Sequence, residues 1–451
     1  MVDTIFALAS APGRAAVAIM RLSGPGTRAA VQTLTGAEPK ARRPSLRALR
    51  RPGDGAALDQ ALVLWFPRPH SYTGEDVAEL HLHGGAAVID GVTEALLGLG
   101  LRLAQPGEFT RRAFEQDKLD LSQAEAIGDL VEAETDAQRR QALAQLDGDL
   151  ARRHAAWREG LVEALALLEA AVDFPDEDLP SEVAQGAAPL IADVAREIDL
   201  ALADGERGER VRDGFRVALI GAPNAGKSSL LNALAGREAA IVTATPGTTR
   251  DIIEAPLSLA GYRVVLGDTA GLRNPKGVIE AEGVRRATAL AEAADLRLMV
   301  VDAAARDERW REAAALARPG DICVLNKRDL APAPEGAAVT AWAAAHRLDV
   351  ADVSVTRGIG LADLRAALTA RVVRSLSGGE FPAATRARHR QDLVAARGHL
   401  TRAMRALTAP VEVELAAEDV RLAARSLARV TGRVDPEDVL DRVFAKFCIG
   451  K

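Results

Sequence analysis

The amino-acid sequence predicts a multidomain α/β protein in which an α/β domain is inserted into a helical domain. The first quarter of the 451-residue chain mixes short apolar runs with turn signals. Two later stretches space apolar residues as helices do, and between them strand-like and helix-like segments alternate. At roughly 100–200 residues per domain, the length suggests two to four domains. We expect segment boundaries at 1–118, 119–212, 213–373 and 374–451, with the second and fourth segments forming one helical domain.

Composition and charge exclude several classes of protein. Hydrophobic residues make up 48% of the chain, which is enough for folded cores and too many for a disordered protein. The formal net charge of −6 argues against non-specific wrapping of nucleic acid, though not against a local basic patch. Two cysteines exclude a disulfide scaffold and fit a reducing compartment. Without a long apolar run or a signal-peptide pattern, we expect a cytoplasmic protein that does not span a membrane.

Basic residues are distributed unevenly between the two types. Only seven of the 57 are lysine, so 50 are arginine. Lysine is a compact point charge, whereas arginine is a wide planar fork. A retained lysine is therefore a candidate for a role that arginine cannot fill.

Residues 1–118 are expected to form a mixed α/β domain. Apolar runs at 15–20 and 60–65 suit strands, and residues 77–83 alternate before a Gly-Gly turn. Residues 40–55 predict an exposed loop or hairpin. His81 and His83, two residues apart on the third strand, are more often packed or hydrogen-bonded than metal-bound when no third ligand is near.

The apolar period becomes helical from Leu121. Ser122 and Glu125 match a capping box, which predicts a helix start at this point. Apolar residues then recur at helical spacing, at Leu161, Leu165, Leu168 and Val172. An acidic, proline-bounded turn at 173–180 separates this stretch from a second one at about 181–210. A Ser/Gly linker at 375–380 precedes a return to helix at 384–451.

A phosphate-binding loop follows the predicted strand at 215–220. Gly221–Ser228 reads G-x-x-x-x-G-K-S and precedes an apolar helix, which is the context that the motif requires. Its backbone amides and the helix N-terminus favour phosphate. We expect Lys227 to reach the β- and γ-phosphates and Ser228 to bind Mg²⁺.

Three further loops follow strands in the order found in guanine-nucleotide-binding domains. Asp268–Gly271 suits the magnesium side of the site. Asp329, in Asn326–Asp329, can accept hydrogen bonds from guanine N1 and its exocyclic amine, and the stem of Lys327 can cover the base. Ser354–Thr356 can complete the base pocket. The four loops together predict a GTPase.

The residues that would catalyse hydrolysis are less evident. Ras-like enzymes place a glutamine after the D-x-x-G loop, and this chain has Leu272, which cannot orient water. No arginine finger can be picked from 50 arginines. Arg273, Glu280 and Glu282 are the nearby polar candidates, and a solvated position would account well for Arg273 and Glu282.

Further segments carry a family resemblance. Thr243–Asp251 resembles the T-x-x-x-G-T-T-R-D loop of the TrmE–Era–EngA group of GTPases. Ser71–Asp76, Gly107–Phe114, Lys118–Leu121 and the terminal Phe447–Lys451 narrow this resemblance to the MnmE (TrmE) family of tRNA-modification GTPases. The resemblance covers essentially the whole chain. It implies an N-terminal folate-binding and dimerisation domain, a discontinuous helical domain and an inserted Ras-like P-loop G domain.

The same resemblance implies a function. It is potassium-dependent GTP hydrolysis coupled to addition of an aminomethyl or carboxymethylaminomethyl group at carbon 5 of the wobble uridine in tRNA. The implied partner is MnmG, which carries FAD and uses NADH. A tetrahydrofolate derivative, 5-formyl- or methylene-tetrahydrofolate, supplies the one-carbon unit. GTP or GDP, Mg²⁺, K⁺ and tRNA are implied ligands, and the assembly is a homodimer and a heterotetramer with MnmG.

The resemblance also implies roles for individual residues. Glu280 is the water-orienting group, acting with Lys227 and Asp268. The magnesium ligands are Ser228 and Thr249, and the potassium ligands are Asn224, Thr243, Thr245 and Thr248. The folate contacts are Arg21, Glu79, Lys118 and Lys451. The full set of expected nucleotide contacts is Asn224, Ala225, Gly226, Lys227, Ser228, Ser229, Thr243, Ala244, Thr245, Pro246, Gly247, Thr248, Thr249, Asp268, Thr269, Ala270, Gly271, Asn326, Lys327, Asp329, Ser354, Val355 and Thr356.

Several alternatives stay open. Cys448 is either a redox or catalytic thiol or a small buried hydrophobe, whereas Cys323 in a predicted strand is structural. The arginines at 42–51 and 386–405 either contact tRNA phosphates or form solvated basic faces. Two other functions are an Era-like ribosome-assembly GTPase and a folate-dependent one-carbon transferase that the GTPase merely regulates.

Overall fold

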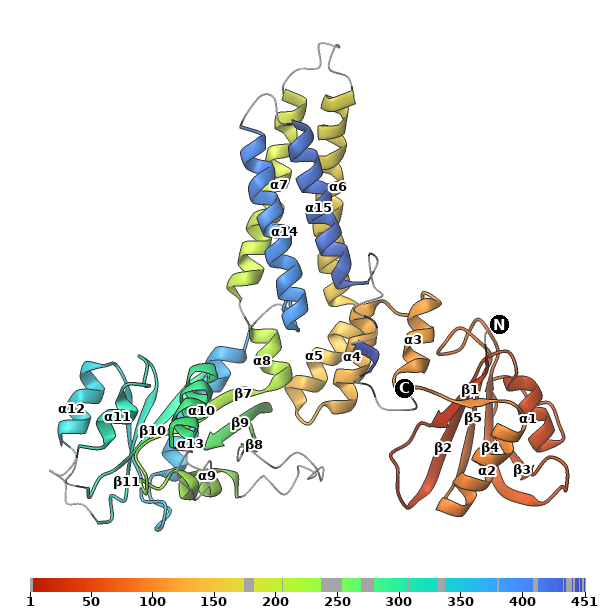
Figure 1. Ribbon diagram of the computed structural model, residues 1–451, viewed down its shortest axis with the longest axis horizontal. Coiled ribbons are helices and arrows are strands. Elements are labelled where there is room, and N and C mark those ends of the chain that lie inside the picture. Colours follow the sequence, from red (N-terminus) through yellow and green to blue (C-terminus); the bar gives the residue numbers. More distant parts are fainter. Residues whose placement is uncertain are drawn as a thin grey trace. The chain divides into compact units, whose positions relative to one another are not determined.

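A computed structural model describes most of the chain in two compact units (Figure 1). The first unit contains 1–128, 145–195 and 392–451, and the second contains 129–144 and 196–391. The described residues are 3–173, 182–204, 206–236, 254–268, 280–305, 308–330, 337–378, 381–408, 413–432, 434, 440, 443–445, 447 and 450.

The first unit begins with a six-stranded mixed sheet. Helices α1 (Thr27–Thr35) and α2 (Ala86–Gly98) pack on one face through a core that includes Leu34, Leu80 and Leu96. All neighbouring strands are antiparallel except β1 and β6. The strand order is β3 (Ser45–Arg50), β4 (Ala57–Phe66), β5 (Val77–Gly84), β2 (Ala15–Ser23), β1 (Ile5–Leu8) and β6 (Arg102–Leu103).

Side-chain alternation gives this sheet two different faces. Since successive residues of a strand point to opposite sides, Leu80 faces the helices while Glu79 and His81 face away from them. The expected hairpin at 40–55 is present, with β3 returning into β4. The second face carries the polar residues and three exposed apolar ones, Val17, Leu46 and Leu62.

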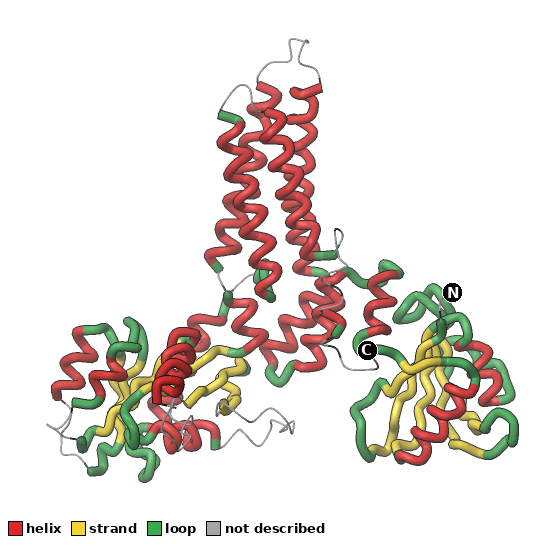
Figure 2. The backbone as a smooth tube through the Cα atoms, in the orientation of Figure 1, coloured by secondary structure: helices red, strands yellow, loops and turns green. Residues whose placement is uncertain are grey.

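Beyond this sheet the first unit is helical, as the tube drawing shows (Figure 2). Helices α6 (Asp149–Asp173) and α15 (Val413–Val430) pack along one another, and Arg421 on α15 pairs with Glu169 on α6 at 2.9 Å. Helix α14 (Ala387–Ala406) is joined to α15 by His399 Nδ1 and Asp419 Oδ1 at 2.8 Å. Helix α7 (Glu182–Ala203) completes the set. The acidic turn at 174–181 lies outside the described residues.

The start of helix α4 (Leu121–Glu132) corrects the expected capping box. The cap is Asp120 with Gln123, not Ser122 with Glu125. Asp120 Oδ1 accepts from the Gln123 amide at 2.8 Å, and Gln123 Oε1 accepts from the Asp120 amide at 3.0 Å. An aspartate and a glutamine satisfy the same orphan amides as serine and glutamate do. Ser122 and Glu125 are instead buried inside the helix.

The second unit contains a six-stranded sheet in which β8 alone is antiparallel to its neighbour. The strands predicted at 215–220, 296–301 and 322–325 are confirmed. Their side chains alternate between two hydrophobic cores, as expected for a sheet buried on both faces. The strand order is β12 (Asp349–Asp352), β11 (Ile322–Asn326), β10 (Leu296–Asp302), β7 (Phe215–Ile220), β9 (Tyr262–Asp268) and β8 (Glu254–Leu259).

Helices cover both faces of this sheet and confirm the predicted α/β class. One core receives α8 (Arg207–Asp213), α9 (Lys227–Ala235) and α13 (Leu361–Leu376). The other receives α10 (Glu280–Ala293), α11 (Trp310–Ala314) and α12 (Ala337–Ala345). Within the described part of the chain, no helix is both long and apolar enough to cross a membrane.

Residues 129–144 pack with the second unit although some 70 residues separate them from its first strand. In helix α5 (Asp136–Leu146), Ala137 joins the core, and its amide donates to Gly261 O in the β8–β9 turn at 3.0 Å. Gln138 is buried and its amide nitrogen donates to Arg212 O at 2.7 Å. Asp129 Oδ1 accepts from Arg212 and Arg386, each at 2.7 Å. Polar contacts to backbone therefore attach this segment.

Gln138→Ala is expected to destabilise the second unit by about 1–3 kcal/mol, because it removes the buried Gln138 amide and leaves the Arg212 carbonyl and the Glu134 and Thr135 amides without their partner. Hydrogen exchange of the full-length chain in urea would measure the loss. Arg140→Ala, at an exposed position on the same helix, is the control and should stay within about 0.5 kcal/mol of wild type. Equal effects of the two changes would contradict the attachment.

Candidate guanine-nucleotide site

The phosphate-binding loop connects β7 to α9 at the carboxyl edge of the sheet. The loop has glycine at two positions where a side chain would not fit. A Cβ at Gly221 would lie 2.2 Å from Val300 O, and one at Gly226 would lie 2.2 Å from Asn326 Nδ2. Both have positive φ, +153° and +99°. The motif therefore has glycine at these two positions because the loop backbone passes close to β10 and β11 there.

Lys227 and Ser228 begin helix α9. Lys227 is 5% exposed, and its ammonium donates to Gly221 O at 2.7 Å and to Ala222 O at 2.9 Å. The charge is thus held inside the curl of the loop, where the N-terminus of α9 adds positive potential. This arrangement suits a polyphosphate.

Ser228 is brought to Asp268, as a magnesium site requires. Strands β7 and β9 are neighbours with Leu219 opposite Asp268, and Ser228 Oγ donates to Asp268 Oδ2 at 2.5 Å. Asp268 is fully buried. A hydroxyl and a carboxylate are hard oxygen ligands, and Mg²⁺ takes one or two such protein groups with water and phosphate oxygens. The two side chains fit that ion.

Asn326 ties the base-side loops to the phosphate loop. Its amide nitrogen donates to Ala225 O at 2.9 Å, and its amide oxygen accepts from the Val355 amide at 3.4 Å. Ser354 Oγ donates to Asp329 Oδ1 at 2.6 Å. This hydrogen bond holds the pKa of the Asp329 carboxyl below its ordinary value. The ionised carboxylate accepts hydrogen bonds only, which matches the donor edge of guanine.

Lys327 reaches across to the phosphate loop. Its backbone is left-handed, with φ 62°, and its ammonium donates to Asn224 O at 3.0 Å and to Asp302 Oδ2 at 2.6 Å. Asn224 is left-handed as well, with φ 64°. Asp302 was not identified from the sequence, where it follows an apolar run without a motif. A cavity of about 360 Å³ lies beside this contact, lined by Pro223, Asn224, Val300, Asp302, Trp310 and Val339 among others.

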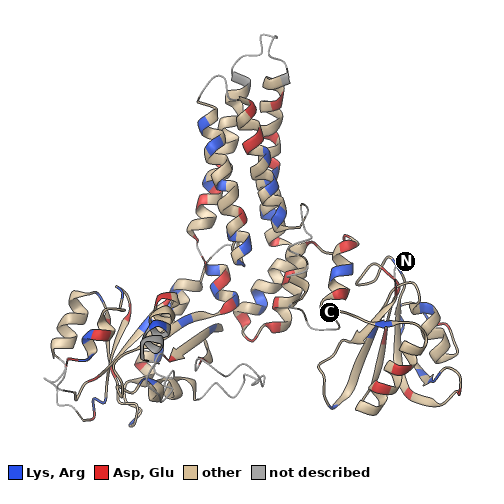
Figure 3. Ribbon diagram, viewed as in Figure 1, with Lys and Arg blue, Asp and Glu red and all other residues tan. Residues whose placement is uncertain are grey.

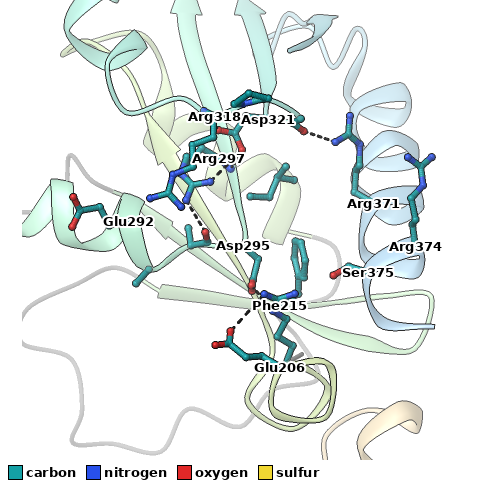
Figure 4. A pocket seen from close by; sticks show the side chains of 16 residues that line it. Glu206, Phe215, Glu292, Asp295, Arg297, Arg318, Asp321, Arg371, Arg374 and Ser375 are labelled. Carbon is teal, nitrogen blue, oxygen red and sulfur yellow. Dashed lines mark hydrogen bonds and ion pairs between the residues drawn. The ribbon is translucent and has the colours of Figure 1, made fainter. Parts of the chain in front are cut away.

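A second cleft, of about 670 Å³, lies at the opposite edge of the sheet (Figure 4). Phe215 and Leu296, the first residues of β7 and β10, line it. Its central charges are paired. Arg210 meets Asp295 at 2.7 Å, and the buried Arg297 meets Asp321 at 3.4 Å. Ligands of parallel α/β sheets bind at the carboxyl edge, so this cleft is not the nucleotide site.

Several predicted site residues lie outside the described part of the chain. Glu280 is the first residue of α10, and its side chain is not described. The predicted site residues that are not described are Thr243, Ala244, Thr245, Pro246, Gly247, Thr248, Thr249, Thr269, Ala270, Gly271, Cys448 and Lys451.

Cys323 is described and buried, and burial raises the pKa of its thiol to about 12, which suits the structural role predicted for it.

In the first unit, Arg21 and Glu79 are opposite each other on β2 and β5. Arg21 Nη2 lies 2.9 Å from Glu79 Oε1, and His81 Nε2 lies 3.3 Å from Glu79 Oε2. The Arg21 guanidinium carbon stands 5.4 Å from the ring centroid of Tyr72 and 5.8 Å from that of Phe109. A cation, a carboxylate and two rings therefore gather on the sheet face opposite the helices.

Two glycine contacts place Lys118 and Gly450 relative to this sheet. A Cβ at Gly74 would lie 3.3 Å from Lys118 Cε, so Lys118 runs along the loop that carries Tyr72. A Cβ at Gly450 would lie 2.2 Å from Leu8 O. The end of the chain thus reaches β1, the strand next to β2.

Arg112 fixes the loop at 71–76 to helix α3 (Glu108–Glu115). It is 8% exposed and donates to Asp3 Oδ1 at 2.7 Å, Glu108 Oε1 at 3.0 Å and Glu75 Oε2 at 3.1 Å. Burial lowers the pKa of its guanidinium, but the carboxylates, with Glu75 first, outweigh burial and raise it. The two motifs at 71–76 and 107–114 therefore share one buried ion cluster, which the sequence did not reveal.

Basic and acidic residues are both spread along the helices, as the ribbon coloured by charge shows (Figure 3). Arg390 pairs with Glu209 at 3.0 Å, and Arg402 pairs with Asp419 at 2.9 Å. Both arginines belong to the basic stretch at 386–405. Pairing with acids favours a solvated, ion-paired face over a face reserved for phosphates.

Gly226→Ala is expected to lower GDP affinity by at least about tenfold, because the added methyl group would displace Asn326 and the left-handed backbone would be strained. Titration with a fluorescent GDP analogue measures the affinity. Gly98→Ala, in helix α2 where an added Cβ would meet no atom within 4 Å, is a control that should retain GDP binding. Wild-type affinity in Gly226→Ala would contradict the close approach.

Comparison with known proteins places the chain in a family. Residues 121–448 match the MnmE helical domain, and residues 4–118 match the GTP-binding protein TrmE N-terminus. The tRNA modification GTPase MnmE of Phenylobacterium zucineum (strain HLK1) is 61% identical over 455 residues, with 100% of both chains covered. The protein of the same name from Caulobacter vibrioides is 58% identical over 451 residues, again with 100% of both covered. The chain therefore belongs to the MnmE family of tRNA modification GTPases.

Proposed function

We propose that this GTPase couples potassium-dependent GTP hydrolysis to modification of the wobble uridine of tRNA at carbon 5. It would act with a MnmG protein that carries FAD and would take its one-carbon unit from a tetrahydrofolate derivative. The observation that carries the GTPase half is the phosphate loop, which holds Lys227 and the Ser228–Asp268 pair and is joined through Asn326 to the loop that carries Asp329. The tRNA half rests on the resemblance to named relatives along the full chain.

Each nucleotide residue has a proposed task. Lys227 would bind the β- and γ-phosphates, and Asp329 would select guanine. Ser228 with Thr249 would hold Mg²⁺, which neutralises phosphate charge when bound. Glu280 would orient the attacking water, since Leu272 cannot.

Potassium would replace an arginine finger. Asn224, with backbone oxygens of Thr243, Thr245 and Thr248, would hold the ion, whose charge acts between the β- and γ-phosphates. The exposed Asn224 side chain has no hydrogen-bond partner among the described residues, and its carbonyl is already held by Lys327. Its amide oxygen is therefore available to a cation.

The folate would bind at Arg21, Glu79, Lys118 and Lys451. A carboxylate suits the donor edge of a pterin, and cationic groups suit the glutamate tail. Tyr72 and Phe109 add aromatic surface beside Arg21. The pairing of Arg21 with Glu79 on neighbouring strands, and the passage of Lys118 along the 71–76 loop, support this assignment.

A homodimer through the N-terminal domain is part of the proposal, with a heterotetramer formed by MnmG. The exposed apolar residues Val17 (52%), Leu46 (67%) and Leu62 (37%) support it, because they share the sheet face opposite the helices. With a net charge of −6, the chain would meet tRNA through its partner and local patches. An Era-like ribosome-assembly role has no observation in its favour, since helices α14 and α15 occupy the C-terminal region.

Replacing Na⁺ by K⁺ at constant ionic strength should raise GTP turnover at least about tenfold, because the bound ion stabilises charge that develops on the phosphates. Glu280→Gln should bind GTP normally and turn it over slowly in either salt. Glu282→Gln is the matched control and should keep the potassium response. Equal wild-type rates in both salts would remove potassium from the mechanism.

Deleting the gene should abolish the carbon-5 groups on wobble uridine, which mass spectrometry of tRNA nucleosides would detect. Arg21→Ala should fail to restore them in that strain while its GTP turnover stays at the wild-type level, because Arg21 serves only the folate site. Arg28→Ala, an exposed arginine on α1 paired with Glu38, should restore them. Full restoration by Arg21→Ala would remove Arg21 from the folate site, and unaltered wobble nucleosides in the deletion strain would remove the tRNA function.

A further inference from the structure

We propose that Asp302 is a positioning residue for the guanine site and that it acts through Lys327 on the phosphate loop. The proposal rests on the guanine site described above. None of the sequence motifs includes Asp302, so its role follows from its contacts alone.

Strand register brings Asp302 to Lys327. Asp302 ends β10 and is opposite Asn326, which ends β11, so Lys327 is the first residue beyond the paired strands. Asp302 Oδ2 lies 2.6 Å from Lys327 Nζ. The other carboxylate oxygen, Oδ1, accepts from the Ala304 amide at 3.0 Å. Both oxygens are thus engaged, and the carboxylate is held in one orientation.

The ammonium of Lys327 makes a second link between two loops that Asn326 already joins. It donates to Asn224 O at 3.0 Å while Asp302 balances its charge. Asn224 and Lys327 both have left-handed backbones, which few residues other than glycine adopt. One ammonium therefore connects the two strained positions and extends the lysine stem between the base loop and the phosphate loop.

Fixing this stem bears on nucleotide binding. A free lysine side chain has about 2 kcal/mol of rotamer entropy to lose on ordering. With Asp302 in place, that entropy is lost on folding and not on binding, so the stem is already placed to cover the base. Asp302 bonds to Lys327 and to the Ala304 amide and not to the Ser228–Asp268 pair, so the rate of hydrolysis at saturating GTP should not depend on it.

A merely structural ion pair would behave differently. The Asp302 and Lys327 side chains are 24% and 34% exposed, and pairs of this kind contribute only slightly to folding stability. A positioning role therefore predicts a large effect on nucleotide release with a small effect on melting of the nucleotide-free protein. It also predicts that the effect disappears once Lys327 cannot donate.

The test is a double-mutant cycle on the full-length chain with fluorescent GDP as the probe. Asp302→Asn should raise the GDP dissociation rate about tenfold and raise KM for GTP with kcat unchanged. Lys327→Met should raise the dissociation rate at least as much, and the double variant should match Lys327→Met alone. Asp302→Glu should recover most of the affinity. Glu308→Gln, on the rim of the same cavity and paired with Arg311, is the control and should release GDP at the wild-type rate.

The outcomes separate this inference from the proposed guanine site. A dissociation rate within twofold of wild type in Asp302→Asn, or independent effects that multiply in the double variant, would overturn the positioning role. The positioning role would also be overturned by two results together. They are a fall in the melting temperature of nucleotide-free Asp302→Asn that accounts for its whole rise in GDP dissociation rate, and no recovery of affinity in Asp302→Glu. Failure of the wild-type chain to bind GDP would instead overturn the guanine site.

Discussion

The nucleotide site depends on one buried amide, the side chain of Asn326. It is 3% exposed, and it holds the phosphate loop through Ala225 O and the base-side loop through the Val355 amide. Other hydrogen bonds shape each loop separately, and the Asn326 side chain fixes the two loops relative to each other. The absence of a side chain at Gly226 follows directly, because the Asn326 amide occupies the space that a Cβ would fill. One hydrogen bond, from the Asn326 amide nitrogen to Ala225 O, thus joins the phosphate-binding loop to the Asn326–Asp329 loop.

The use of lysine at two positions has a geometric reason. Lys227 donates to two carbonyls inside the phosphate loop, and Lys327 donates to a third carbonyl and a carboxylate. A compact ammonium can point its three donors into a tight curl of backbone, whereas a planar guanidinium cannot. The chain has 50 arginines, but an arginine at Lys227 or Lys327 could not make the same hydrogen bonds as the lysine does.

Prediction from sequence succeeded where a local pattern determines the structure. The buried strands, the order of the four loops and the meeting of Ser228 with Asp268 follow from apolar runs and motif spacing. The predicted helix cap was wrong because Asp120 and Gln123 make the same hydrogen bonds two residues before Ser122 and Glu125. The roles of Arg112 and Asp302 were not predicted, because most of the residues that they bond to are distant in the sequence and meet them only in the folded chain. A buried cation among carboxylates and an acid at a strand end have no sequence signature.

The attachment of residues 129–144 to the β8–β9 turn has a mechanical consequence. Strand β9 runs from that turn to Asp268, and it is hydrogen-bonded on both sides, to β7 and to β8. A strand paired on both edges cannot stretch or slip without breaking its ladder, because a slip of one residue would turn every side chain to the other face. It therefore behaves as a stiff rod about seven residues long, or roughly 23 Å. Asp268 lies at one end of this strand and the amide of Ala137 holds the turn at the other, so a displacement along β9 at either end moves the other end as well.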